Sequence, residues 1–144
     1  MDKAQQSYEQ EKQPHMLELA SSYVEKLTGE RYTLDILGIN KGVALINNNG
    51  ERLELKFWSS GLADQVYLSL RLALAKVFSY QVESLPIILD DILVRFDENR
   101  QLSALELLAE LGKNQQIWLF TCQRSVYDMA QSIMGIDCHR LSRS

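Results

Sequence analysis

Two short polar segments of this sequence carry residue types that suit phosphate and metal chemistry. The first is Ser59-Ser60-Gly61, which stands before a helical pattern over residues 66–80. Small residues at the start of a helix leave backbone N–H groups open to an anion such as phosphate. The second is the acidic pair Asp90-Asp91, which follows the apolar run at residues 85–89. Carboxylates at the end of a buried strand suit a hydrated divalent metal ion.

In this order, the two segments resemble the signature motif and the Walker B motif of ABC-type ATPase heads. The stretch from Trp58 to Gln65 and the strand that ends at Asp91 are most similar to those of the SMC/SbcC-like group of DNA-repair ATPases, especially its YhaN-like branch. The resemblance covers nearly the whole chain, but only the second half of such a head. It implies an α/β fold, the C-terminal lobe of a P-loop NTPase head. That lobe has a parallel sheet flanked by helices and an N-terminal antiparallel β meander.

No G-x-x-x-x-G-K-[ST] loop occurs in the sequence. In that loop, backbone N–H groups and a lysine bind the phosphates of the nucleotide. We therefore expect the chain to need an N-terminal Walker A lobe before it binds ATP, and we expect the isolated chain to be inactive. The resemblance further implies ATP and Mg²⁺ as cofactors and a second head as the partner in an ATP-dependent dimer.

The resemblance assigns the first segment to nucleotide binding across that dimer. Ser59 supplies a hydroxyl, and Gly61 allows the backbone to approach the γ-phosphate held by the opposite head. The usual pattern of the family is L-S-G-G-[QE], and this sequence departs from it at Trp58, Ser60 and Leu62. The alternative for Ser59 is an ordinary serine N-cap at the start of a helix.

Arg71 lies on an apolar part of the helix that follows, between Leu70 and Leu72. A charged side chain in such surroundings needs a partner. The resemblance implies that Arg71 couples the signature helix to neighbouring structure. A structural ion pair is the alternative.

The resemblance also assigns roles to the acidic pair. Asp90 orients Mg²⁺ through a water molecule, and Asp91 stands where most heads carry a catalytic Glu that positions the attacking water. Asp is one methylene shorter than Glu, which affects the efficiency of hydrolysis more than the location of the site. The alternative is a pair of acids that cap the strand end or the following turn.

Two further positions complete the set that the resemblance implies. The segment around Asp97 resembles the D-loop, which lies across the dimer from the nucleotide of the partner, although Asp97 is also suited to cap a helix. Gln123, after Thr121 and Cys122, takes the place where such heads usually carry a His that senses the γ-phosphate. A Gln side chain forms hydrogen bonds but does not titrate near neutral pH. A polar strand end is the alternative for Gln123.

The pattern of apolar residues predicts the elements that position these side chains. We expect one domain in three ranges: 1–28 as the helical end of a possible coiled-coil arm, 29–58 as the β meander, and 59–144 as the signature and Walker B lobe. Pro14 suits the first turn of a new helix, which Gly29 ends. The predicted strands of the meander are residues 31–37, 42–46 and 51–57, with a turn at Asn47-Asn48-Asn49-Gly50.

The last range predicts strands that alternate with helices, and hence a parallel sheet. Its predicted elements are a strand at 85–89, a helix from Asp97 to Gly112, a strand at 116–121, a helix from Ser125 to Gly135, and a last strand at 136–141.

Composition narrows the function classes. A net charge of −4 gives no support for nucleic-acid binding by this lobe alone. Two cysteines fit a reducing compartment, and no apolar run has the length of a membrane span, so we expect a cytoplasmic protein without a membrane partner. DNA and a nuclease subunit are expected as partners of the full assembly, through the resemblance to DNA-repair and DNA-end-processing proteins. Two alternatives stay open: a degenerate dimerisation module, and a metal-dependent hydrolase that uses Asp90 and Asp91 directly.

Overall fold

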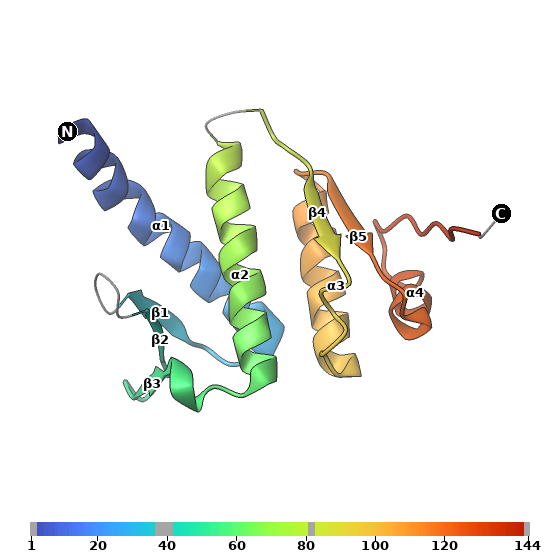
Figure 1. Ribbon diagram of the computed structural model, residues 1–144, viewed down its shortest axis with the longest axis horizontal. Coiled ribbons are helices and arrows are strands. Elements are labelled where there is room, and N and C mark those ends of the chain that lie inside the picture. Colours follow the sequence, from blue (N-terminus) through green and yellow to red (C-terminus); the bar gives the residue numbers. More distant parts are fainter. Residues whose placement is uncertain (1–2, 37–41, 81–82, 143–144) are drawn as a thin grey trace. The chain divides into compact units, whose positions relative to one another are not determined.

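The computed structural model describes residues 3–36, 42–80 and 83–142, and it confirms the α/β class (Figure 1). The chain divides into two compact units, Met1–Glu83 and Ser84–Ser144. The expected single domain with three ranges stays a prediction. In the described part of the chain, no helix combines the length and the hydropathy that a membrane span requires.

The first unit pairs two long helices with a small antiparallel sheet. Helices α1 (Lys3–Thr28) and α2 (Ser60–Ser79) pack against each other. Strands β1 (Thr33–Ile36), β2 (Val43–Ile46) and β3 (Arg52–Glu54) form the sheet in the order β1-β2-β3, so the antiparallel meander is confirmed. The buried core of this unit consists of Ala20, Tyr23, Val24, Leu27, Leu34, Ala44, Leu45, Val66, Leu68, Leu72 and Ala73.

The turns of the meander are formed by residues whose conformations and hydrogen bonds favour them. Gly29 ends α1 with φ +72, and Gly50 closes the β2–β3 turn with φ +78, both in the region that glycine adopts at little cost. Asn47 holds that turn, because its Oδ1 accepts hydrogen bonds from the N–H groups of Asn49 and Glu51 at 3.0 and 2.9 Å. The turn predicted from the Asn-Gly pair is therefore confirmed.

Two expectations for this unit were wrong. Pro14 does not begin a new helix, because α1 runs without a break from Lys3. Pro14 is exposed inside this helix, and it lacks the N–H that would bond to the preceding turn. The strand predicted at 51–57 ends at Glu54, where its pairing with Ala44 ends next to the start of β2. A short 3₁₀ helix, η1 (Leu55–Phe57), follows it.

The second unit is a parallel β–α–β arrangement. Strands β4 (Ile87–Asp90) and β5 (Ile117–Phe120) pair in parallel, and helix α3 (Glu98–Gly112) connects them and lies along one face of the pair (Figure 1). Helix α4 (Arg124–Ala130) packs against α3. The parallel sheet predicted for this part of the chain is therefore confirmed. Its buried apolar residues are Leu89, Leu93, Phe96, Ala104, Leu105, Leu107, Leu108, Val126 and Ala130.

The C-terminal elements differ from the prediction in two ways. Helix α4 begins at Arg124 and ends at Ala130, rather than running from a Ser125 cap to Gly135. Backbone turns follow it, in which the N–H groups of Ser132 and Ile133 bond to the carbonyls of Met129 and Ala130. No strand forms over residues 136–141, where Leu141 is 85% exposed and none of the described strands pairs with this segment.

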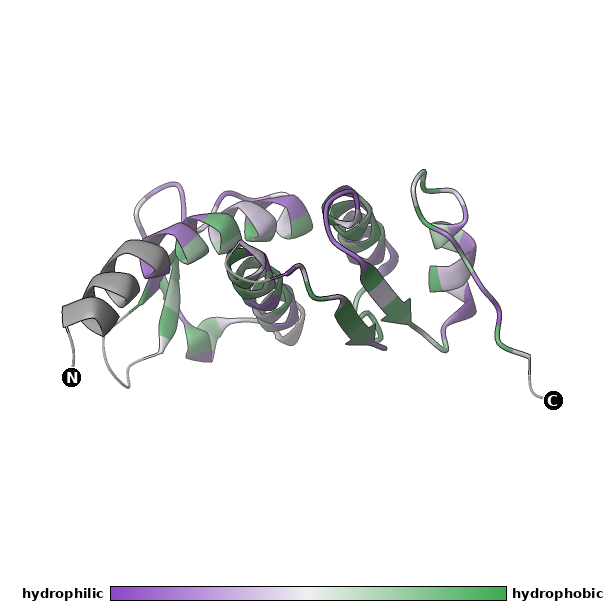
Figure 2. Cartoon of the chain, turned by 90° about the horizontal axis from the view of Figure 1, so that it is seen from above, coloured by the Kyte–Doolittle hydropathy of each residue, from purple (hydrophilic) through white to green (hydrophobic). Residues whose placement is uncertain are grey.

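The outer face of β4 and β5 remains apolar and open. Both strands are hydrophobic along most of their length (Figure 2). On one face Ile87 and Leu89 point toward the core, whereas Ile88, Trp118 and Phe120 on the other are 67%, 48% and 45% exposed. The continuous apolar run predicted a strand covered on both faces. In the described residues, only one face of this pair is covered.

Candidate nucleotide site

The turn before α2 carries the first predicted group. Ser59 is the N-cap of α2, and its Oγ accepts a hydrogen bond from the N–H of Leu62 at 3.1 Å. Its carbonyl accepts the N–H of Ala63 at 2.9 Å. Ser59 and Ser60 are exposed, whereas Gly61 is buried. The serine cap is thus confirmed, and the start of α2 presents the positive end of a helix to solvent.

Trp58 fixes the entry of the chain into this turn. Its indole Nε1–H donates to the carbonyl of Leu53 at 2.9 Å, and its backbone N–H donates to the carbonyl of Leu55 at 3.1 Å. Both bonds tie the residue before the cap to β3 and η1. The departure from Leu at this position therefore adds a hydrogen bond that holds Ser59 in place.

Arg71 lies in the middle of α2 with its side chain exposed, and it forms no ion pair within the described residues. Tyr67, Leu74 and Phe78 share its helical face by their spacing of four, three and seven residues. They are 51%, 45% and 56% exposed. The alternative of a structural ion pair is not supported in the described residues, and the coupling role stays a prediction.

The acidic pair lies at the carboxyl end of β4. Asp90 is the last residue of the strand, is exposed, and lies opposite Phe120 in the parallel register. Asp91 follows with φ +48, in the left-handed region that non-glycine residues seldom adopt. Its N–H donates to the carbonyl of Phe120 at 2.8 Å. Asp90 is therefore still part of the strand, whereas the chain changes direction at Asp91.

The loop after β5 reaches the Asp91 carboxylate. The Thr121 hydroxyl donates to Oδ1 of Asp91 at 3.3 Å, and the Cys122 thiol donates to Oδ2 at 3.3 Å. The hydrogen bond to Asp91, together with its negative charge, raises the pKa of the Cys122 thiol. The ends of both parallel strands therefore meet at this carboxylate.

Gln123 joins the same cluster through its backbone and its side chain. Its N–H donates to Oγ1 of Thr121 at 3.1 Å. Its Oε1 accepts from Nε2 of Gln101 at 3.2 Å, and Gln101 Nε2 also donates to the carbonyl of Leu93 at 3.2 Å. Gln101 is only 4% exposed. Asp91 and Gln123, which the sequence assigned to catalysis, are thus brought together through Thr121.

Asp97 is the N-cap of α3, as predicted. Its Oδ1 accepts from the N–H of Arg100 at 2.9 Å, and Oδ2 lies 3.5 Å from Nε of Arg100. The carboxylate is 60% exposed, so capping leaves it accessible to solvent. One turn later in the same helix, Gln101 contacts Gln123.

The sequence interpretation missed the structural roles of two buried glutamines, Gln65 and Gln101, and of the Thr121-Cys122 pair. Gln101 and Gln65 occupy positions where the helical period calls for an apolar residue, and this was the available signal. Gln65, 1% exposed, donates from Nε2 to the carbonyl of Leu27 at 2.6 Å and so ties α2 to the last turn of α1. Both glutamines satisfy buried backbone carbonyls.

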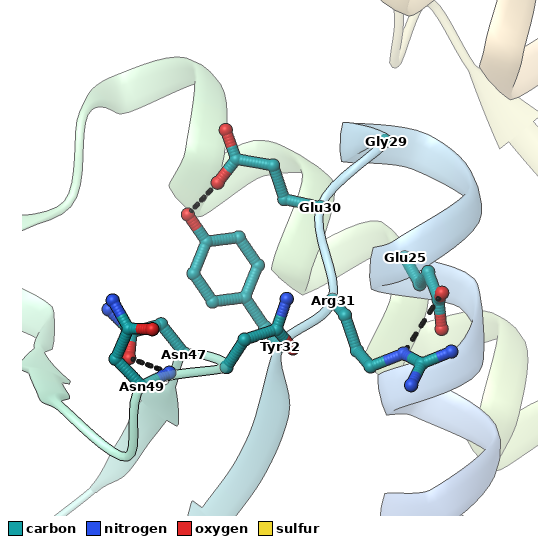
Figure 3. A pocket seen from close by; sticks show the side chains of 8 residues that line it. Glu25, Gly29, Glu30, Arg31, Tyr32, Asn47 and Asn49 are labelled. Atoms are coloured by element: carbon teal, nitrogen blue, oxygen red, sulfur yellow. Dashed lines mark hydrogen bonds and ion pairs between the residues drawn. The ribbon is translucent and has the colours of Figure 1, made fainter.

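A separate polar hollow lies between the end of α1 and the β2–β3 turn (Figure 3). Its side chains pair with one another: the Tyr32 hydroxyl donates to the Glu30 carboxylate, and Arg31 lies 3.3 Å from Glu25. The Glu30 contact raises the pKa of Tyr32. None of the residues assigned to chemistry lines this hollow.

Among the described residues, no group of three or more His, Cys, Asp or Glu side chains has an arrangement that could hold a metal ion. A single strand-end carboxylate such as Asp90 nevertheless fits Mg²⁺. That ion commonly takes only one or two protein carboxylates and fills its other positions with water and substrate phosphates.

Comparison with known proteins identifies one curated relative and a consistent set of folds. No protein-family model matches the chain. The uncharacterized protein YhaN of Bacillus subtilis (strain 168) is 33% identical over 122 residues, which cover 83% of this chain and 12% of YhaN. The chain therefore spans only 12% of the length of this relative.

SMC ATPases are among the solved structures that have a similar fold. A chain from work on ATP-driven dimerization and DNA-stimulated activation of SMC ATPases has a TM-score of 0.69 at 16% identity, over 93% of this chain and 83% of that one. The SMC head domain from Thermotoga maritima has a TM-score of 0.62 at 19% identity, over 81% and 40%. An SMC head bound to the C-winged helix domain of ScpA has a TM-score of 0.62 at 15% identity, over 81% and 37%.

The chain has the fold of a part of an SMC-like ATPase head. The expected resemblance to YhaN-like and SMC-like heads is therefore confirmed.

Proposed function

We propose that this chain is the C-terminal lobe of an SMC-like ATPase head, which forms ATP sites only with an N-terminal Walker A lobe and a second, facing head. The observation that carries the proposal is the network at the ends of β4 and β5, which gathers Asp91, Thr121 and Gln123 beside the strand-end Asp90. Ligands of open parallel sheets bind at the carboxyl ends of the strands. The SMC-like fold supplies the context for that edge.

Within this proposal each residue has a defined task. Ser59, Ser60 and the backbone at Gly61 bind the γ-phosphate held by the facing head, aided by the partial positive charge at the start of α2. Asp97 faces the nucleotide of the partner from the start of α3. Arg71 couples α2 to neighbouring structure through its exposed side chain.

At the strand ends, Asp91 accepts a hydrogen bond from the attacking water and orients it. Gln123 hydrogen-bonds the γ-phosphate or that water, without a proton to give up. Asp90 holds Mg²⁺ through water, and the ion, when bound, offsets the negative charge of the phosphates. ATP then joins two heads, and its hydrolysis releases them.

The wider assembly is proposed from the relatives. One matching structure comes from work on ATP-driven dimerization and DNA-stimulated activation of SMC ATPases, and another contains a head with an extended coiled coil. By analogy, α1 is the end of a coiled-coil arm, and the complete protein acts on DNA in repair or end processing, with a nuclease subunit as a further partner. A cytoplasmic location follows from such a role.

A charge test at Ser59 separates phosphate binding from helix capping. Asp and Asn both cap helices about as well as Ser, so neither variant loses the bond to Leu62. In a head reconstituted with a Walker A lobe, Ser59→Asp places a carboxylate against the γ-phosphate, whereas Ser59→Asn has nearly the same shape without the charge. We expect Ser59→Asp to abolish ATP-dependent dimers in light scattering, and Ser59→Asn to retain them.

The thermal unfolding of both variants is the control. Two variants that melt close to the wild-type temperature but differ in dimer formation support the signature assignment. Equal dimer formation by Ser59→Asp and Ser59→Asn would mean that Ser59 only begins the helix.

A further inference from the structure

The Asp91 carboxylate is held from the neighbouring strand end, and this support has no counterpart in the motifs from which the function was proposed. Each carboxylate oxygen accepts one hydrogen bond: Oδ1 from the Thr121 hydroxyl and Oδ2 from the Cys122 thiol, both at 3.3 Å. An ionised carboxylate offers about four lone-pair sites, so two of them remain for a water molecule.

The backbone at Asp91 shows that this placement is not the relaxed one for such a residue. Its φ of +48 lies in the left-handed region, which costs an L-residue free energy unless its surroundings hold it. The N–H of Asp91 is fixed by the carbonyl of Phe120 at 2.8 Å, next to the two donors in sequence. Residues 120–122 thus determine both the backbone and the side chain of Asp91.

Hydrogen bonds from neighbouring residues also hold Thr121 and the loop that carries both donors. Oγ1 of Thr121 accepts the N–H of Gln123 at 3.1 Å, which directs the hydroxyl proton toward Asp91. The buried Gln101 binds the Gln123 side chain and the Leu93 carbonyl, both at 3.2 Å, and so anchors the loop to α3. Hydrogen bonds therefore connect α3 to Asp91 in three steps.

We propose that Thr121 and Cys122 are positioning residues that clamp the Asp91 carboxylate in the geometry for orienting the attacking water. The proposal rests on the proposed function of Asp91. Asp is one methylene shorter than the Glu usual at this place, and a clamp that fixes a short carboxylate on a left-handed backbone offsets the shorter reach. Hydrogen bonding to the Asp91 carboxylate also raises the pKa of the Cys122 thiol, which keeps the thiol in its donating form.

The contact can be tested on this chain alone, without ATP. Cys122 and Cys138 are both free thiols, so the alkylation of each can be followed by peptide mass spectrometry. Removal of the Asp91 charge in Asp91→Asn favours the reactive thiolate of Cys122. We expect the alkylation rate of Cys122 to rise several-fold while the rate of Cys138 stays unchanged. An unchanged rate at Cys122 would show that the clamp does not form.

The catalytic consequence is tested in the reconstituted head. Thr121→Val keeps the shape but loses the hydroxyl, and Cys122→Ala loses the thiol. Each should lower kcat on the order of ten-fold at unchanged KM for ATP, because a misplaced group affects the transition state more than binding. Thr121→Ser and Cys122→Ser restore a donor and should recover most of the rate.

The outcomes separate this proposal from the one on which it rests. Wild-type turnover in Asp91→Asn would overturn the catalytic role of Asp91 and with it the need for a clamp. Loss of turnover in Asp91→Asn together with normal kcat in Thr121→Val and Cys122→Ala would overturn the clamp alone. A raised KM at constant kcat, or no recovery with Ser at either position, would also contradict it.

Discussion

Asp91 is, at the scale of a single residue, a position whose backbone is unfavourable and whose side chain is held by its neighbours. A left-handed backbone disfavours an Asp, yet two side-chain donors and one backbone acceptor surround it. Strained conformations of this kind concentrate at functional sites, where the surrounding structure holds them. The strained residue here is the one that the sequence had assigned to the catalytic position.

The stability of variants at Asp91 should therefore depend on how well each residue tolerates a left-handed backbone. A left-handed conformation costs residues with a Cβ atom roughly 1–2 kcal/mol relative to Gly, and Asn tolerates it better than Ala. We expect Asp91→Gly to unfold at a higher urea concentration than Asp91→Ala, with Asp91→Asn between them. Because Gly and Ala both lack the carboxylate, the loss of its hydrogen bonds cancels when these two variants are compared. Equal stability of the Gly and Ala variants would show that the residue has a relaxed backbone in solution.

The sequence predicted the residues whose roles are local and missed those whose partners are distant. A cap was predicted at Asp97 and was the alternative given for Ser59, because a capping side chain bonds an N–H only three residues ahead. Gln101 meets Gln123 across 22 positions, and Gln65 meets the Leu27 carbonyl across 38. No pattern of neighbouring residues contains those pairings, although a polar side chain at an apolar position of a helix was a visible signal.

At the scale of elements, the boundaries that depend on neighbouring residues were predicted, and those that depend on distant partners were not. The Asn-Gly turn, the Gly29 stop and the β4–α3–β5 order follow from local chemistry and apolar periodicity. The end of β3 depends on where its partner β2 begins, and this cannot be predicted from the residues of β3 alone. The segment 136–141 has strand-like residues but no described strand beside it.

Helix α1 provides a test at this scale, because Pro14 lies inside it. A proline in a helix interior is about 3 kcal/mol less favourable than alanine. We expect Pro14→Ala to increase the helical signal in circular dichroism and to raise the free energy of unfolding by up to about 3 kcal/mol. Pro86→Ala, outside the helices, is the control and should leave the helical signal unchanged. No gain from Pro14→Ala would mean that the turns before residue 14 are not helical in solution.

At the scale of the whole molecule, the chain exposes apolar surface on one face of the β4–β5 pair. Ile88, Trp118 and Phe120 form the open face of the β4–β5 pair, and both strands are also free to pair at their outer edges within the described residues. An apolar sheet face of this kind favours a further layer of structure. The absence of a phosphate-binding loop in the sequence points to the same missing part, the proposed N-terminal Walker A lobe.

The isolated chain should therefore bind Mg-ATP only weakly. The turn at Ser59 and the strand ends at Asp90 and Asp91 are proposed to contact the γ-phosphate and the metal, but the loop that holds the other phosphates is absent from the sequence. We expect calorimetry with Mg-ATP to show no saturable heat at micromolar nucleotide, and the same titration to show binding after the Walker A lobe is added. ADP gives a control for the second titration, because it lacks the γ-phosphate that the signature turn and Gln123 are proposed to contact. Tight binding of one ATP per isolated chain would contradict the assignment of this chain to half of a site.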